Sequence, residues 1–330
     1  CAYWHGLFGG IYLPHLRHGV FQNVLEADAW LNEDLGSHIK VEEEDYDGDL
    51  EPEVIVSSRA LQAFFRWSDA GTMVELDYLP SRFNVGNVVT RWKESYHSGE
   101  DITHAGTSED GVSSPHEISV GIRPSDLKFG TFDTVPLRSF REFYTATDLD
   151  TARLQKLEGI TLATGRMKDR HLTPKGWEGS HNVGPLTYLK RFTFQDPETM
   201  AAQWTLSPGG PDGFFGTLLC FTLLTADGEG RSAEVTTGAG SFWKGKPGDP
   251  VDCDGVTQFT WKDSVFGFAF DVTTPKPVRL ITTPIQTLQR SEKGYEAVYQ
   301  GTLIALRWPV RSIMENGGTV GANLHFRRIQ

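Results

Sequence analysis

The run Phe214–Leu224 reads FFGTLLCFTLL and is the longest apolar stretch of the chain. It contains a glycine and two threonines and has about half of the ~20 residues that a membrane span needs, so it is predicted to be a buried strand. Similar β-branched and aromatic runs occur at 54–56, 61–67, 73–78, 186–194, 256–261, 278–282 and 298–308. Turn-forming clusters of glycine, proline, aspartate and asparagine lie at 207–213, 226–230 and 316–318. The pattern predicts a mainly β protein with one large antiparallel β-sandwich over residues 37–330.

The composition fits a β-rich globular protein, because the 330 residues include 35 glycines, 17 prolines and 12% aromatic residues. The formal net charge is -12. Nucleic acids and anionic membranes are bound through clustered lysine and arginine, so this charge argues against both partners. Cys1, Cys220 and Cys253 form no CxxC pair and lack zinc-ligand spacing. We expect free thiols in a reducing compartment, which favours a cytoplasmic protein.

One helix is predicted near the start of the chain. Its apolar residues step by three and four, which places them on one helical face: Leu13, Leu16, Val20, Val24, Ala27, Leu31 and Leu35. Pro14 suits a first helical turn, and Gly36 suits a left-handed stop. This apolar stripe is expected to be buried, either against the β-sandwich or against a segment that precedes Cys1. We therefore divide the chain into a helical part, residues 1–36, and the β-sandwich, residues 37–330.

An acidic segment follows the helix. Asp45, Asp47, Asp49 and Glu53 stand at relative positions 1, 3, 5 and 9. Carboxylates at alternate positions of a tight loop converge on one hard cation, and calcium prefers such oxygen ligands. The sixth position, where calcium loops place glycine, is Leu50. The segment is a candidate calcium site, and the alternative is a solvated acidic loop.

The first ten residues, CAYWHGLFGG, lack an initiator methionine and read as the middle of a motif, so we expect the chain to be the back part of a longer protein. Trp4 and His5 suit a sugar site, because an indole stacks on a pyranose ring and an imidazole donates to a hydroxyl. Gly6 and the glycines after it let the backbone approach a ligand closely. The alternative is a buried tryptophan beside a core histidine.

A second cluster contains Glu94, His97 and His116. A glutamate base and a histidine acid would transfer protons on a sugar, as an epimerase requires. Residues of this kind on strand edges are more often structural. The sequence has no glycine-rich phosphate loop, no GxSxG elbow and no HExxH, so nucleotide, acyl-transfer and zinc-protease functions lack support.

The stretch Ala2–Arg17, AYWHGLFGGIYLPHLR, resembles closely a motif of the family 57 glycoside hydrolases, in the branch of α-amylases and 4-α-glucanotransferases. The resemblance continues through residues 45–53, 74–78 and 90–97, and near the end through 283–287 and 299–301. It implies a galactose mutarotase-like β-supersandwich preceded by a short helical segment. The implied substrate is an α-1,4-glucan or maltooligosaccharide, and no cofactor is required.

In that family a barrel of strands and helices carries a glutamate nucleophile and an aspartate acid/base, which act by a retaining double displacement. Neither catalytic motif is found in this chain. The resemblance therefore implies that the chain alone is inactive and that an N-terminal catalytic barrel is its missing partner. It also implies that Trp4, His5 and Gly6 line one wall of the sugar site.

The chain departs from the branch after Arg138, where Arg141 and Glu142 replace an expected Asp-His pair. Such a change is expected to weaken any binding function of the sandwich. Two other functions stay open. One is a noncatalytic carbohydrate-binding or scaffolding module, and the other is a mutarotase-like epimerase that uses Glu94 with His97 or His116.

Overall fold

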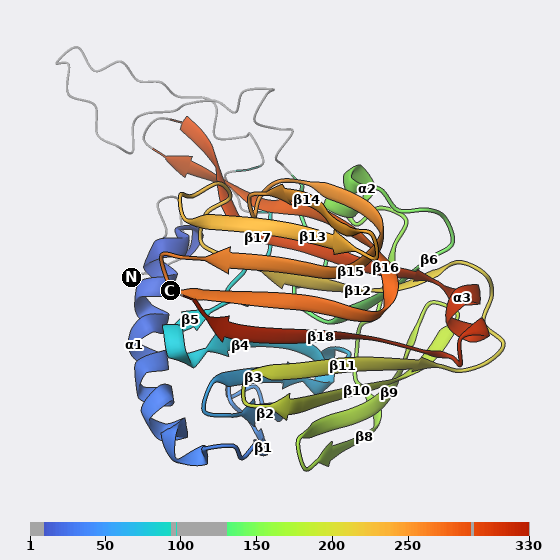
Figure 1. Ribbon diagram of the computed structural model, residues 1–330, viewed down its shortest axis with the longest axis horizontal. Helices are drawn as coiled ribbons and strands as arrows, with labels where there is room; N and C mark the ends of the chain where they lie inside the picture. The colour runs from blue at the N-terminus through green and yellow to red at the C-terminus, as the bar shows by residue number, and fades with distance from the viewer. Residues whose placement is uncertain (1–9, 94–96, 98–130, 292–293, 330) are drawn as a thin grey trace.

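The computed structural model describes residues 10–93, 97, 131–291 and 294–329. Helix α1 (Pro14–Asn32) precedes a region built almost entirely of strands (Figure 1). Within the described residues, the other α-helices are α2 (Thr151–Lys156) and α3 (Val310–Glu315), with six residues each. Short 3₁₀ turns are η1 (Gly10–Tyr12), η2 (Glu33–Leu35), η3 (Trp67–Asp69) and η4 (Leu79–Ser81).

The strands form two antiparallel sheets. The smaller sheet follows the order of the sequence: β1 (Lys40–Glu44), β2 (Glu53–Ser57), β3 (Leu61–Arg66), β4 (Thr72–Tyr78) and β5 (Phe83–Asn84). The larger sheet has thirteen strands, whose main path is β7 (Thr161–Leu162), β6 (Arg141–Thr145), β12 (Phe214–Phe221), β17 (Gly294–Pro309), β16 (Phe268–Ser291), β18 (Thr319–Arg328), β11 (Thr199–Leu206), β10 (Leu186–Asp196), β9 (Gly176–Val183) and β8 (Lys168–Thr173). Strands β13 (Arg231–Thr237), β14 (Gly240–Gly245) and β15 (Val251–Asp263) extend this sheet beside β16. The prediction of a mainly β, antiparallel fold behind a short helical segment is confirmed.

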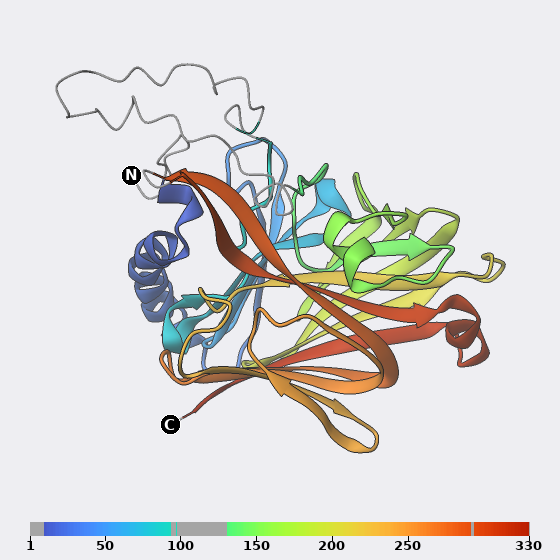
Figure 2. The same cartoon turned by 90° about the horizontal axis from the view of Figure 1, so that it is seen from above.

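Strands β16 and β17 are unusually long, with 24 and 16 residues, and they pair with each other over most of their length. A register shift between Ile285 and Gln286 marks an irregularity in the pair, of the kind that bends strands. Figure 2 shows the two strands as a curved ribbon that crosses the molecule from α3 toward the start of α1. This ribbon brings residues near the end of the chain close to residues near its beginning.

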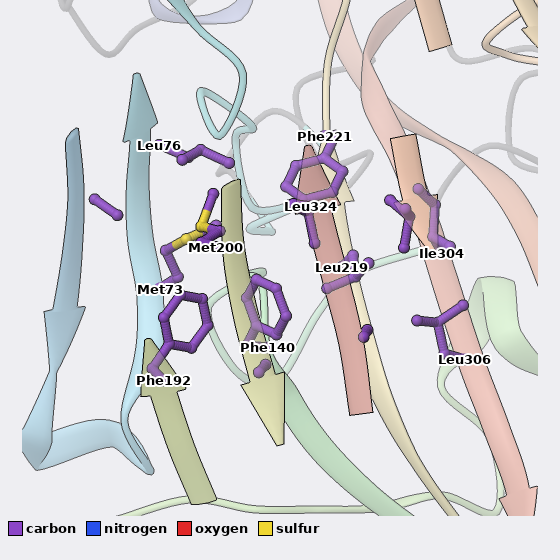
Figure 3. Close-up of a cluster of buried hydrophobic side chains, with 14 of the residues drawn as sticks. Met73, Leu76, Phe140, Phe192, Met200, Leu219, Phe221, Ile304, Leu306 and Leu324 are labelled. Atoms are coloured by element: carbon purple, nitrogen blue, oxygen red, sulfur yellow. The ribbon is translucent and has the colours of Figure 1, made fainter. Parts of the chain in front are cut away.

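The main hydrophobic core lies between the two sheets (Figure 3). Met73 and Leu76 of β4 are buried there together with Phe192 of β10 and Met200 of β11. Side chains alternate along a strand, and every second residue from the start of β10 to Phe194 is accordingly buried. Every residue of β12 except Phe214 is buried, as predicted for that run, because its outer face packs in a second apolar cluster with α2.

Two cysteines of the described residues, Cys220 and Cys253, are free and buried. Burial raises the pKa of the Cys220 thiol to about 12, with the negative charge of Asp133 as the next cause. Cys220 is therefore protonated and unreactive near neutral pH while the chain stays folded.

Helix α1 packs on the β region with a face that is rotated by roughly a quarter turn from the predicted one. Its buried residues are Pro14, Arg17, His18, Leu25 and Asn32. Gly36 ends the helical segment with a φ of 56°, as expected. The prediction that the apolar stripe is buried is wrong for the described residues, because Val24 is 51% and Leu31 is 78% exposed. No helix of the described residues is long and apolar enough to cross a membrane.

Candidate functional site

The opening motif, residues 2–17, is hydrogen-bonded to a strand near the end of the chain. Tyr12 is buried, and its carbonyl oxygen accepts a hydrogen bond from Nε2 of Gln300 at 2.9 Å. Gln300 lies in β17, and the same nitrogen donates to Oγ1 of Thr287 in β16 at 2.8 Å. The stretches around residues 12, 287 and 300, which all carry the family resemblance, therefore meet at one place in the fold.

Arg17 fixes the first turns of α1. Its side chain is buried, Nε donates to Oδ1 of Asn87 at 3.0 Å, and Nη2 donates to the carbonyl oxygen of Asn87 at 3.1 Å. Nη1 donates to the carbonyl oxygen of Ile11. A buried guanidinium is stable only when its donors are bonded, so these contacts join η1 and the start of α1 to the backbone at Asn87. Trp4, His5 and Gly6 lie outside the described residues.

Of the proposed acid/base cluster the structure describes His97, whereas Glu94 and His116 lie outside the described residues. Nε2 of His97 is 2.7 Å from the carbonyl oxygen of Leu288 in β16 and donates to it. The imidazole also packs on Phe132, with ring centroids 5.0 Å apart. His97, Tyr12 and Thr287 line one small cavity, so this histidine lies beside the junction of the opening motif with β16.

The acidic loop brings three of its four predicted ligands together. One carboxylate oxygen from each of Asp45, Asp47 and Asp49 lies within 4.8 Å of the others, and all three residues are exposed. Leu50 adopts a φ of 70°, which is the left-handed region that glycine favours, so it takes the conformation expected of the missing glycine. Glu53 is buried in β2 and is not part of this group.

Arg66 of β3 binds some of the same carboxylates and would compete for them with a cation. Its guanidinium forms ion pairs with Asp47, with Asp49 at 3.3 Å and with Glu53 at 3.3 Å. Burial nevertheless raises the pKa of Glu53, and the positive charge of Arg66 opposes that shift. The three exposed carboxylates suit a hard cation, and such a cation would share two of them with Arg66.

Glu142, which with Arg141 stands in place of the expected Asp-His pair, belongs to a buried network. Glu142 in β6 accepts hydrogen bonds from the hydroxyl of Tyr188 and from Nε1 of Trp204, each at 2.8 Å. Nζ of Lys190 lies 2.9 Å from Oε1 of Glu142, and both side chains are fully buried. Burial lowers the pKa of Lys190, while the charge of Glu142 opposes this. The network joins β6 to β10 and β11 and has no opening to solvent, so it acts as structure.

Arg141 belongs to a neighbouring ion pair. Its Nη1 donates to Oδ1 of Asp69 at 2.8 Å and to the carbonyl oxygen of Ala163 at 2.7 Å. Arg138 also donates to Asp69, at 2.6 Å. Hydrogen bonds and charge from the two arginines lower the pKa of Asp69 against the opposing effect of burial. Arg141, one of the two residues that stand in place of the expected Asp-His pair, thus forms an ion pair between β6 and η3.

Lys190 was not singled out from the sequence, although a signal for it exists. Tyr188, Lys190 and Phe192 occupy the same face of β10, and all three are buried. A lysine at a core position of an otherwise apolar alternation must have a partner inside the protein.

Family models match most of the chain. The model described as "Alpha-amylase/4-alpha-glucanotransferase, C-terminal" matches residues 45–317, and the one described as "Alpha-amylase/4-alpha-glucanotransferase, middle domain" matches residues 1–31.

Individual relatives agree with the family models. The alpha-amylase of Pyrococcus abyssi is 25% identical over 99% of this chain and 46% of its own length. The 4-alpha-glucanotransferase of Thermococcus kodakarensis is 35% identical over 38% of this chain and 18% of its own length. The crystal structure of 4-alpha-glucanotransferase from Thermococcus litoralis shares the fold, with a TM-score of 0.74 and 18% identity over 99% of this chain and 44% of that one. The chain spans less than half the length of these relatives.

Proposed function

Because the chain belongs to the alpha-amylase/4-alpha-glucanotransferase family, we propose that it works as the C-terminal portion of an enzyme that processes α-1,4-glucans or maltooligosaccharides. In this proposal a catalytic barrel supplies the glutamate nucleophile and the aspartate acid/base of a retaining reaction. This chain supplies one wall of the sugar site and a large β domain. The glucosyl group passes to water or to a second glucan.

The exposed apolar stripe of α1 is the observation that supports this proposal most. Leu16 is 40%, Val20 is 42% and Leu31 is 78% exposed, and Trp30 beside them is 71% exposed. A contiguous apolar surface of this kind marks an interface. All of the helix except its last residue lies within residues 1–31, which match the family's middle domain, so the part of the enzyme that contains the barrel is the proposed occupant. Helix α1 then joins the β domain to the catalytic part.

Val24→Glu combined with Leu31→Glu tests this interface in the complete enzyme. We expect the activity on maltooligosaccharides to fall about tenfold or more, because two unpaired carboxylates enter an apolar contact. Gln22→Glu, off the stripe on the same helix, is the matched control and should retain activity. In the chain alone both variants should change the free energy of unfolding by less than about 0.5 kcal/mol. Full activity of the double variant would contradict the proposal, and glucan binding by the chain without a barrel would favour a noncatalytic module.

Trp4, His5 and Gly6 line the sugar site in this proposal, because the motif that contains them ends at the fixed positions Tyr12 and Arg17. In the complete enzyme Trp4→Ala is expected to lower kcat/KM for maltooligosaccharides about tenfold, since a stacking ring contributes up to about 1.5 kcal/mol. Trp4→Phe keeps a stacking face and should lose much less. Steady-state kinetics with a circular dichroism check of folding makes the measurement. Equal losses in the two variants would exclude stacking.

We propose a weak calcium site at Asp45, Asp47 and Asp49, while the reaction itself needs no cofactor. Calcium at ten times its Kd should stabilise the chain by about 1.4 kcal/mol, measured as a shift of the unfolding midpoint. Asp47→Asn removes one ligand and should abolish most of this shift. Glu44→Gln, an exposed acid at the end of β1, is the control and should keep it. Equal shifts in both variants would argue against this loop as the site.

A further inference from the structure

A cavity of about 560 Å³ lies over the neighbouring strands β10, β11 and β18 of the larger sheet (Figure 1). Along most of each strand every second residue is buried in the core, so the side chains between them point to the outer face, where they line the cavity. Two of these positions, Ala201 of β11 and Gly321 of β18, have side chains of one carbon atom or none, which leaves the space open. The volume falls in the range of about 300–1,000 Å³ that small-molecule sites take, and we call this cavity the outer groove.

Three carboxamide side chains that line the outer groove have no hydrogen-bond partner in the described part of the chain. They are those of Gln195 in β10, Gln203 in β11 and Asn323 in β18. A carboxamide donates through its nitrogen and accepts through its oxygen, and a sugar hydroxyl does both, so each side chain can exchange two hydrogen bonds with a sugar. The groove therefore offers donors and acceptors that the protein itself does not use.

The charged residues of the outer groove are already bonded within the protein. Nε of Arg191 donates to Oε2 of Glu178 at 2.6 Å, which neutralises the guanidinium. Nζ of Lys276 donates to the carbonyl oxygens of Asn316 and Thr319, each at 2.7 Å. Among the described residues that line the groove there is no carboxylate. A cation would find no charged ligand here and an anion would meet one unneutralised charge, so a neutral polar ligand fits best.

We propose that the outer groove binds a neutral polyhydroxylated chain, which in this protein is an α-1,4-glucan. The hydrogen-bonding groups give the class of ligand, and the identity of the sugar rests on the function proposed above. Ala201, Pro275 and Val320 add apolar surface on which the C–H groups of a sugar ring can pack. No aromatic ring lines the groove among the described residues, so we expect a weak site with a Kd of about 1 mM.

This site is separate from the sugar site of the opening motif, because it shares no residue with that motif. Its role would be to keep one part of a long glucan on the β domain while another part reacts in the barrel. Linking two weak contacts through one chain raises the overall affinity without any new contact at the reacting sugar. The outer groove should therefore matter for long glucans and not for short ones.

The first test titrates the chain with maltoheptaose by isothermal calorimetry. Gln203→Ala combined with Asn323→Ala removes two of the free carboxamides and should raise Kd at least about fivefold. Ala201→Leu fills the space without removing a polar group and should raise Kd by a similar factor. Asn182→Ala removes an exposed carboxamide on β9 outside the groove, so it is the matched control and should keep the original Kd. Equal affinity of the double variant and the control would overturn the proposal.

Inorganic phosphate separates a glucan site from an anion site. An anion site would use the charge of Lys276, so phosphate would bind there and displace maltoheptaose. We expect that excess phosphate leaves the Kd for maltoheptaose unchanged. Displacement by phosphate would overturn the assignment of a neutral ligand.

Glucan binding by the chain alone is also expected of a noncatalytic module, so kinetics of the complete enzyme separate the two. The Gln203→Ala and Asn323→Ala double variant should raise KM for amylose more than KM for maltotriose, which is too short to reach both sites. An equal rise for the two substrates would show that the variant acts through the barrel and would overturn the groove. The Val24→Glu and Leu31→Glu variant tests the proposed function through activity itself, so failure of the groove and failure of that function give different results.

Discussion

Replacing Lys190 with methionine is expected to destabilise the folded chain by about 3–5 kcal/mol. Methionine fills nearly the same volume, so the loss comes from charge and not from a cavity. Glu142 would stay buried with its negative charge, and the hydrogen bonds from Tyr188 and Trp204 do not neutralise it. Such a loss is a large fraction of the 5–15 kcal/mol by which typical domains are stable. Urea unfolding followed by tryptophan fluorescence measures it.

Two further variants separate this cause from general damage to the core. Glu142→Gln added to Lys190→Met removes the unpaired charge, keeps an acceptor for Trp204, and should recover about half of the loss. Lys262→Met on β15 removes an exposed lysine and should change stability by less than about 0.5 kcal/mol. No recovery in the double variant would contradict the electrostatic explanation.

Arg91→Met is expected to have an effect of similar size, about 3–5 kcal/mol. Nε of Arg91 donates to Oδ2 of Asp133 at 2.9 Å, Nη2 donates to Oδ1 at 2.6 Å, and both side chains are buried. The backbone N–H of Arg91 donates to the same carboxylate at 2.9 Å. Arg91→Lys restores the charge but not the two-pronged geometry and should recover only part of the loss.

The labelling rate of the Cys220 thiol measures how often the structure around it unfolds in these variants. Its thiol, with a pKa raised to about 12 by burial, reacts with a labelling reagent only after local or global unfolding. The labelling rate at pH 8 should therefore rise in Arg91→Met. Arg311→Met, which removes an exposed pair with Glu315 at 3.0 Å, is the control and should leave the rate unchanged. An unchanged rate in Arg91→Met would show that the Arg91–Asp133 pair does not restrain this region.

The sequence predicted the elements better than their packing. The helix from Leu13 to Leu35 appears as α1 followed by η2, because a period of three and four, an early proline and a final glycine are local signals. Most of the run at 214–224 forms the buried strand β12, residues 214–221, for the same kind of reason. Periodicity shows that a helix has an apolar face, but it does not say which neighbour covers it. The buried face of α1 contains Arg17 and Asn32 because their polar groups find partners in Asn87 and Gln62 far along the chain. His18 is buried on the same helix against the rings of Phe83 and Phe266.

The candidate site shows the same limit. The acidic loop was found from spacing, and three of its four ligands do converge. Arg66 was missed because it comes from the neighbouring strand, where pairing with β2 places it beside Glu53. The Glu142–Lys190 pair was missed because its members are 48 residues apart and meet only when β6 and β10 lie in one core.

The bond between Gln300 and Tyr12 joins residues that are 288 positions apart. A ribosome that adds 5–20 residues per second needs roughly 15–60 s to make that length of chain. During this interval Tyr12 has been synthesised but the strand that holds it has not. The bond that holds Tyr12 is therefore among the last contacts to form during synthesis, whereas the partners of α1 at Gln62 and Asn87 are made much earlier.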